Sequence, residues 1–282
     1  MDKSDQYFYT FDSSEHRNFG NFLTRNLHEL VVYRYAIYNF ISSILRARYR
    51  RSAIGFLWSL LNPLLTMAIM AVVFSSIFHN AVANFSIYLF SGLLPWTLIS
   101  NSLLNGSLSI VQGEAYLKKV YVPKLIFPLV TVGVEVVNFL LSLISLFFLA
   151  ILLGAKVSWA LLSLPIALLL TALFLLGVVL ILGILTVYFR DLSHIVQIAM
   201  TGLFYLTPIV YQTNVLQPTS KLLILIKLSP LYYYVDLFHA IIYNGSFPDI
   251  STWLICLGLT IVSLFAGLTI FSLREKDVIY RL

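Results

Sequence analysis

Six long apolar stretches limit what this chain can fold into. They run over residues 57–78, 85–111, 125–153, 159–187, 195–211 and 252–272. A helix needs about 20 apolar residues to cross a bilayer, and these runs are too continuous for the alternating strands of a membrane barrel. Only 11% of the 282 residues are charged, against about 25% in soluble domains. The sequence therefore predicts an all-α integral membrane protein, with six transmembrane helices in residues 57–282.

The segment before the first run, residues 1–56, is more polar and more charged than the rest of the chain. Between Asn21 and Leu45 the apolar residues recur at helical spacing on one side, interrupted by charged residues such as Arg34. An arginine at the centre of a span costs about 2.5–3.5 kcal/mol on insertion scales. We therefore expect a cytoplasmic N-terminal segment with an amphipathic helix lying in the membrane interface, and regard a seventh span as the weaker alternative.

Lysine and arginine predict the orientation. Fifteen of the eighteen lie before the first run, in the loops on the same side or after the last run, and only Lys156, Lys221 and Lys227 fall on the other side. Because positive residues concentrate on the cytoplasmic side, both termini are expected to be cytoplasmic. The cluster Arg46, Arg48, Arg50 and Arg51 would mark the cytoplasmic boundary of the first span.

Motifs of catalysis are missing from the sequence. It contains no P-loop, no H-E-x-x-H and no G-x-S-x-G pattern, and its histidines and single cysteine, Cys256, are scattered. We therefore expect no catalytic residue, no metal site and no cofactor in this chain. The net charge of +6 favours anionic membrane lipid as a partner over nucleic acid, because no soluble basic domain is present.

Glu135 is the acidic residue that needs an explanation, because it falls about ten residues into the third run. One interpretation is an ion-coupled secondary transporter built around this carboxylate. The other is structural, with Asn138 three residues further on as a hydrogen-bond partner. A third hypothesis, a membrane transferase that uses Glu114 or Asp191 as its base, has little support because neither residue has a partner near it in sequence.

Several separated blocks resemble one protein family. They are RYRRSAIGFLWSLLNPLL, SGLLPWTLISNSL, YLKKVYVPKLIFPL, FRDLSHIVQIAMTGLFYLTPIVY and SPLYYYVDLFHAIIYNG. In this order they are similar to the membrane subunit of bacterial type-2 ABC exporters of polysaccharides such as O-antigen, capsule or teichoic acid. The resemblance runs from about residue 40 to the C-terminus, and it is specific to the family rather than to one glycan.

The resemblance implies an assembly and a location. The permease would form a homodimer in the bacterial cytoplasmic (inner) membrane, with two copies of a separate ATPase subunit beneath it that bind ATP and magnesium. Two cytoplasmic loops would receive the motion of the ATPase. The residues implied for this coupling are Lys118, Lys119, Tyr121, Arg190 and Asp191.

The resemblance also implies a cargo and a path for it. Lipid-linked (polyprenyl-diphosphate) glycan would enter at Arg46, Arg48, Arg50 and Arg51, although these arginines are equally explained as boundary markers. Sugars stack on aromatic rings, so aromatic side chains would line the channel. The candidates are Tyr88, Trp96, Tyr205, Tyr211, Tyr232, Tyr233 and Tyr234, with core or interface packing as the alternative for each. Between spans five and six, short re-entrant helices are implied at the outer face.

Overall fold

The computed structural model describes residues 19–48, 52, 55–78, 82–152, 158–211, 221–275 and 277–281. All regular structure in these ranges is helical, which confirms the all-α part of the predicted fold class. The α-helices are α1 (Phe19–Val32), α2 (Arg34–Arg48), α3 (Trp58–Phe78), α4 (Val82–Ser107), α5 (Ser109–Gln112), α6 (Glu114–Leu117), α7 (Ile126–Leu152), α8 (Leu164–Tyr188), α9 (Leu192–Leu206), α10 (Lys221–Leu228), α11 (Pro230–Phe238), α12 (Ile250–Arg274) and α13 (Val278–Arg281).

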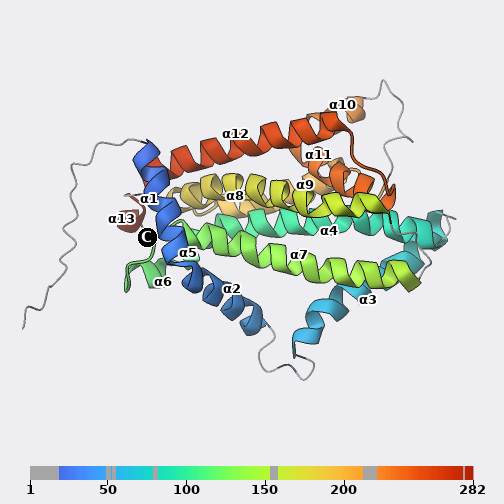
Figure 1. Cartoon of the computed structure of the whole chain (residues 1–282), viewed down its shortest axis with the longest axis horizontal. Helices are drawn as coiled ribbons and strands as arrows, with labels where there is room; N and C mark the ends of the chain where they lie inside the picture. The colour runs from blue at the N-terminus through green and yellow to red at the C-terminus, as the bar shows by residue number, and fades with distance from the viewer. Residues whose placement is uncertain are drawn as a thin grey trace, which may run out of the picture.

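Four long helices, α4, α7, α8 and α12, run side by side along the long axis of the molecule (Figure 1). The most extensive contact joins α8 to α12. At this crossing a Cβ atom on Gly267 would collide with the backbone of Gly177 in α8, so the two backbones meet directly. Small residues allow such an approach, which is a common way for helices to pack in lipid, where the hydrophobic effect does not drive association.

Four helical segments are long and apolar enough to cross a membrane: Phe85–Ser107, Ile126–Ile151, Trp159–Tyr188 and Ile250–Arg274. Leu60–Met70 in α3 and Leu192–Leu206 in α9 are apolar but shorter. The six apolar runs of the sequence therefore all form helices. Within the described residues, four of these helices are long and apolar enough to span a membrane, whereas the apolar parts of α3 and α9 are shorter.

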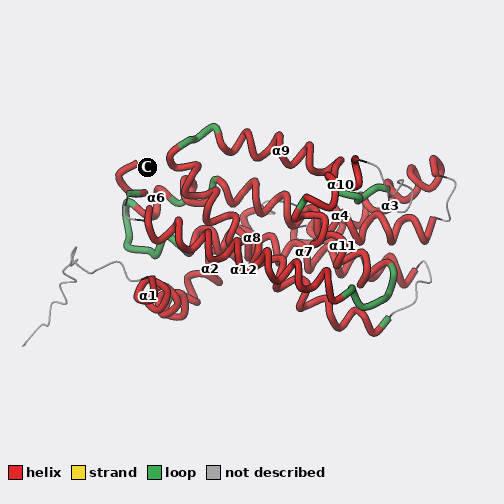
Figure 2. The backbone as a smooth tube through the Cα atoms, turned by 90° about the horizontal axis from the view of Figure 1, so that it is seen from above, coloured by secondary structure: helices red, strands yellow, loops and turns green. Residues whose placement is uncertain are grey.

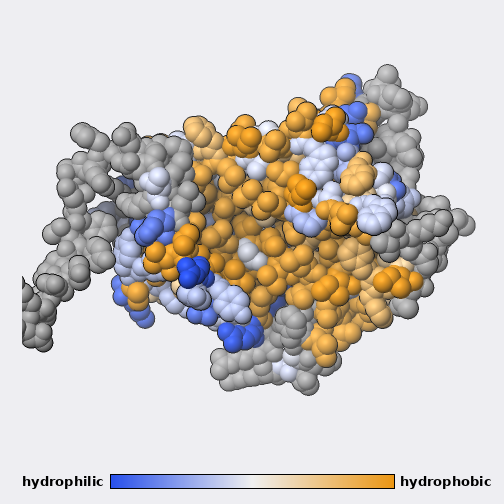
Figure 3. Space-filling view, in the orientation of Figure 1, coloured by the Kyte–Doolittle hydropathy of each residue, from blue (hydrophilic) through white to orange (hydrophobic). Residues whose placement is uncertain are grey.

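The surface of the bundle is apolar along its length, with hydrophilic residues gathered mainly toward its ends (Figure 3). Ile144, Phe148 and Ile151 of α7 are 57–67% exposed, as are Ile261 and Phe265 of α12 at 59% and 63%. Apolar side chains this exposed on long helices are expected where lipid, and not water, surrounds the protein.

The N-terminal amphipathic segment is two helices, where the sequence predicted one. The break comes at Tyr33, after which α2 packs against α7 and covers Ile126, Val130 and Val134. Seen from above, α1 is viewed almost along its axis, so it lies across the end of the bundle (Figure 2). The break places the Arg34 guanidinium at the start of α2, where it bonds the Val31 carbonyl instead of facing an apolar core.

Both ends of the described chain lie at the same end of the bundle, where α1, α6 and α13 gather (Figure 1). The Lys124 ammonium donates to the carbonyl of Glu275, and the Tyr121 hydroxyl donates to the Glu29 carboxylate at 3.5 Å. These contacts tie the first loop to the C-terminal end and to α1. We call this the terminal end; α10 and α11 lie at the other end.

The fifth apolar run does not form one helix to its end, because α9 ends at Leu206, just before Pro208, which has no backbone donor to continue it. After it come α10, α11 and a π-helical turn, His239–Tyr243. α11 packs against α4, α8 and α12, and the hydroxyl of its buried Tyr234 donates to the Cys256 carbonyl at 2.9 Å. The short helices between α9 and α12 are therefore part of the bundle.

Candidate functional site

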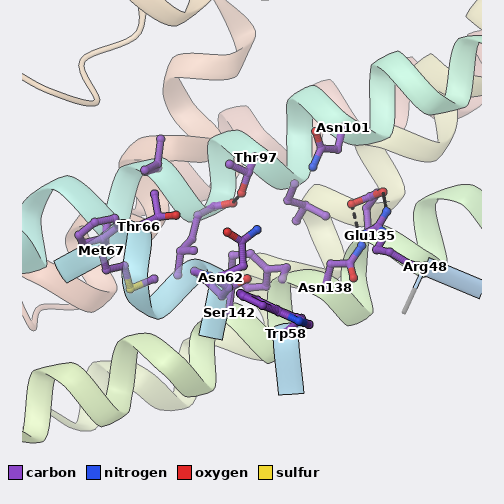
Figure 4. A pocket seen from close by; sticks show the side chains of 16 residues that line it. Arg48, Trp58, Asn62, Thr66, Met67, Thr97, Asn101, Glu135, Asn138 and Ser142 are labelled. Carbon is purple, nitrogen blue, oxygen red and sulfur yellow. Dashed lines mark hydrogen bonds and ion pairs between the residues drawn. The ribbon is translucent and has the colours of Figure 1, made fainter. Parts of the chain in front are cut away.

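A polar cleft of about 250 Å³ opens between α3, α4 and α7 (Figure 4). Each of these apolar helices contributes one polar stripe to it. The stripes are Asn62 and Thr66 on α3, Thr97 and Asn101 on α4, and Glu135, Asn138 and Ser142 on α7. Spacings of three and four residues place the members of a stripe on one face of a helix. The sequence thus contains three polar helix faces, and the fold brings them together to form the cleft.

Glu135 lies at one end of the cleft and is 3% exposed. Its carboxylate accepts hydrogen bonds from Asn138 at 3.0 Å and from Asn105 at 3.2 Å, and the Arg48 guanidinium approaches it to 3.7 Å. The bond from Asn138 is the one that the three-residue spacing predicted. Partners from α2, α4 and α7 together compensate a carboxylate that would otherwise be costly to bury.

This pairing also places Arg48. Glu135 lies nine residues after the start of α7 at Ile126, about 14 Å at the helical rise. Arg48 therefore sits well along α7 from the terminal end, because α2 runs against that helix and Glu135 offers its guanidinium a partner. Arg46 stays on the surface and bonds the Ser42 carbonyl, while Arg50 and Arg51 lie outside the described residues.

The predicted coupling residues gather at the terminal end. Lys118 forms an ion pair with Glu114 at 2.5 Å, and this partner holds the pKa of the Glu114 carboxyl below its usual range. Arg190, from the second loop, also lowers the pKa of this carboxyl, and Figure 2 shows the loop before α9 at the same end of the molecule as α6. Lys119, Tyr121, Arg190 and Asp191 are all exposed. The structure thus brings both loops to one accessible surface.

Comparison with known proteins identifies the family. A profile described as ABC-2 type transporter matches residues 35–243. This chain belongs to the ABC-2 transporter membrane family. It is 32% identical over 255 residues to the O-antigen export system permease protein RfbA of Myxococcus xanthus, covering 90% of this chain and 98% of that protein. A Klebsiella pneumoniae protein of the same name is 30% identical over 174 residues, covering 61% and 67% respectively. The resemblance read from the sequence blocks is confirmed.

Within this ABC-2 fold, the aromatic candidates for the channel lining divide into two groups. Tyr205 is 73% exposed on α9, which runs along the rim of the bundle in Figure 2. Tyr211, Tyr232 and Tyr233 are partly buried. Trp96 is only 5% exposed, but it borders a shallow groove between α4 and α9 together with Tyr205.

Tyr88 and Tyr234 are enclosed by the subunit. The Tyr88 ring stacks on His239 at 4.6 Å between centroids, and its hydroxyl donates to the Tyr211 carbonyl at 2.6 Å. The Tyr234 ring stacks on Phe174 at 4.5 Å. Both side chains are buried within the subunit, Tyr88 at 7% and Tyr234 at 0% exposed, so their role in lining a channel stays a prediction.

Two features of this ABC-2 subunit were missed by the sequence reasoning. One is the set of polar stripes, whose signal was the recurrence of Asn, Ser and Thr every three or four residues within apolar runs. The other is the buried pair of Ser91 and His239, whose Oγ and Nδ1 atoms lie 2.8 Å apart. Nothing in the sequence relates these two residues, since 148 positions separate them.

Proposed function

We propose that this chain is the transmembrane subunit of an ATP-driven exporter that moves lipid-linked polysaccharide, such as O-antigen, across the bacterial cytoplasmic membrane. The observation that carries the proposal is the similarity to the Myxococcus xanthus permease, which covers 98% of that protein. Because similarity extends over nearly the whole relative, it includes both cytoplasmic loops and the cleft, and not only a shared set of apolar helices.

The proposed topology has six spans, with α3 and α9 as the two shorter or tilted ones. Both termini would be cytoplasmic. The gathering of α1 and α13 at the terminal end supports an even number of crossings (Figure 1). The position of Lys221 and Lys227, in α10 at the other end, agrees with the charge asymmetry of the sequence. In this arrangement α10 and α11 re-enter the membrane from the outer face.

ATP hydrolysis would take place on two copies of a separate ATPase subunit docked at the terminal end. The surface formed by Lys118, Lys119, Tyr121, Arg190 and Asp191 would receive its motion. Supporting this role, the two loops lie at the same end of the bundle (Figure 2) and Arg190 lowers the pKa of Glu114, so one partner surface can act on both loops. The first loop is also tied to α1 and to Glu275, which would carry such a push into the bundle.

The glycan would pass between two copies of this chain. The exposed face of α9 is the candidate wall, with Tyr205 and the groove beside Trp96 as positions where sugar rings can stack. Tyr211, Tyr232 and Tyr233 would continue this path toward the outer end. Arg46 and Arg48, with Arg50 and Arg51 beyond the described helix, would attract the diphosphate on the cytoplasmic side.

The test is reconstitution with the ATPase that co-purifies in mild detergent. We expect a P-loop ATPase to co-purify, and export of lipid-linked glycan to stop when the P-loop lysine of that ATPase is replaced. Collapse of the proton gradient with ATP retained should leave export intact. If no ATPase co-purifies, and export survives without ATP but stops with the gradient, the chain is instead an ion-coupled transporter centred on Glu135.

A further inference from the structure

The polar cleft between α3, α4 and α7 has more hydrogen-bonding capacity than the protein itself uses. Asn62, Asn101 and Ser142 line it and make no hydrogen bond to any residue in the described part of the chain. Figure 4 shows these side chains around one open space, together with Thr66 and Thr97. Unpaired amides and hydroxyls are unfavourable in an apolar bundle unless water or a polar ligand satisfies them. The cleft is therefore built to hold something polar.

The chemistry of the lining selects the ligand class. Its free groups are amides and hydroxyls, which both donate and accept hydrogen bonds, as the hydroxyls of a sugar do. The charges present, Glu135 and Arg48, already face each other. Trp58 forms part of the wall and is 38% exposed, so its indole face is available for the apolar face of a pyranose ring. A divalent cation fits poorly, because Glu135 is the only acidic, His or Cys side chain among the residues that line the cleft, and no group of three such side chains occurs in the described part of the chain.

The size of the cleft limits how much of a glycan it can take. A space of about 250 Å³ corresponds to roughly eight water molecules at about 30 Å³ each. It lies just below the usual range of small-molecule pockets, which begins near 300 Å³. One sugar ring is the appropriate occupant, and a longer piece of the chain must remain outside.

Arg48 adds an anion-binding group to the lining. Its side chain is 45% exposed and touches Glu135 only through Nη2, at the long distance of 3.7 Å. Its Nε and Nη1 have no partner in the described part of the chain and can bind a phosphate oxygen, which guanidinium groups bind well. A sugar in the cleft that carries a phosphate would place that phosphate within reach of this group.

We propose that this cleft binds the sugar that is joined directly to the lipid diphosphate, with the diphosphate at Arg48. The inference rests on the proposed function, and it adds a recognition site for the sugar within one subunit, next to Arg48 at the proposed entrance for the diphosphate. It assigns Asn62, Asn101, Thr66 and Ser142 to the ring hydroxyls and Trp58 to the ring face. The cleft thus distinguishes a loaded lipid carrier from an empty one before the glycan is moved.

The experiment measures binding to the purified permease in nanodiscs. Two probes are compared: a polyprenyl diphosphate carrying one N-acetylhexosamine, and the same polyprenyl diphosphate without sugar. We expect the wild-type protein to prefer the sugar-bearing lipid. In the double variant Asn62→Leu/Asn101→Leu the preference should fall about fivefold for each lost hydrogen bond. Arg48→Gln should weaken the binding of both probes equally and leave the ratio of their affinities unchanged.

A matched pair of threonine variants supplies the control. Thr66→Val removes a hydroxyl from the cleft, whereas Thr269→Val removes one from the exposed face of α12, where it bonds only its own helix through Phe265. Only the first should reduce the sugar preference. This pair also keeps the test decisive if the double asparagine variant does not fold.

Two results would overturn the proposal: no sugar preference in the wild-type protein, or a preference that survives every cleft variant. Either result would show that the cleft does not bind the sugar and is filled by water or covered by a second subunit. ATP-dependent export by the wild-type complex is measured separately. If export is present and the preference absent, only the cleft proposal fails; if export itself is absent, the proposed function fails.

Discussion

Replacing Glu135 tests whether its carboxylate is structural or carries an ion. Glu135→Leu removes the acceptor of the bonds from Asn105 and Asn138 and the partner of Arg48. A hydrogen bond to a charged group contributes about 1.5–3 kcal/mol. Asn105 and Arg48 are exposed, so in the variant both can form hydrogen bonds with water, and their contributions to stability are small. We therefore expect Glu135→Leu to lower the free energy of unfolding by about 2 kcal/mol. Glu135→Gln keeps one carbonyl acceptor and should lose about 1 kcal/mol.

The assay is equilibrium unfolding in detergent, with export measured in parallel on the folded fraction. For a chain of this size, 1 kcal/mol corresponds to a fall in Tm of about 2–4 °C. Asn138→Ala is the matched control, because it removes the strongest of the same bonds from the other side. A double-mutant cycle of Glu135→Gln with Arg48→Gln should give a coupling below about 1 kcal/mol, since the pair is long and half-exposed.

If the role of Glu135 is structural, stability and export should respond differently to its replacement. Export per folded complex should be unchanged in Glu135→Gln, because the fold and the cleft remain. An opposite pattern, in which Glu135→Gln unfolds like the wild type but no longer exports, would refute this reasoning. That result would mean that the ionised carboxylate itself takes part in transport.

Further predictions concern the coupling loops and the helix contacts. Asp191→Lys should leave insertion intact but separate ATPase activity from export in the reconstituted complex; unchanged export would argue against a coupling role for the second loop. Gly267→Val should prevent α8 and α12 from meeting and sharply lower the yield of folded protein. Gly202→Ala, inside α9, is the control, because its Cβ would meet nothing within 4 Å and alanine favours the helix, so stability should rise by about 0.4–1 kcal/mol. The Glu114 carboxyl should titrate by NMR at a lower pH than in an unfolded peptide, since Lys118 favours its charged form, and Lys118→Met should move the midpoint back up. A midpoint that does not respond to this change would mean that the ion pair is not formed in solution.

The aromatic residues show why site assignments made from sequence were only partly useful. Tyr88, Tyr205 and Tyr234 look alike in the sequence, each among apolar neighbours. Tyr205 faces outward because α9 lies on the rim of the bundle, whereas Tyr234 is enclosed because α11 is wedged against three other helices. Whether a ring lines a surface depends on what covers it, and residues far away in sequence supply that cover.

The sequence alone determined that this protein lies in a membrane, because so many long apolar runs cannot all be buried in a soluble fold. It also determined the helical class, because in lipid the backbone of each continuous segment must form its hydrogen bonds within that segment. It determined the family as well, through blocks that lie in a common order. Tertiary structure decided the rest. It divided the N-terminal helix at Tyr33, paired Arg48 with Glu135, and joined three separate polar stripes into one cleft. The physical reason is that hydropathy and backbone propensity act locally, whereas a polar group inside a bundle is satisfied by whichever helix packs beside it.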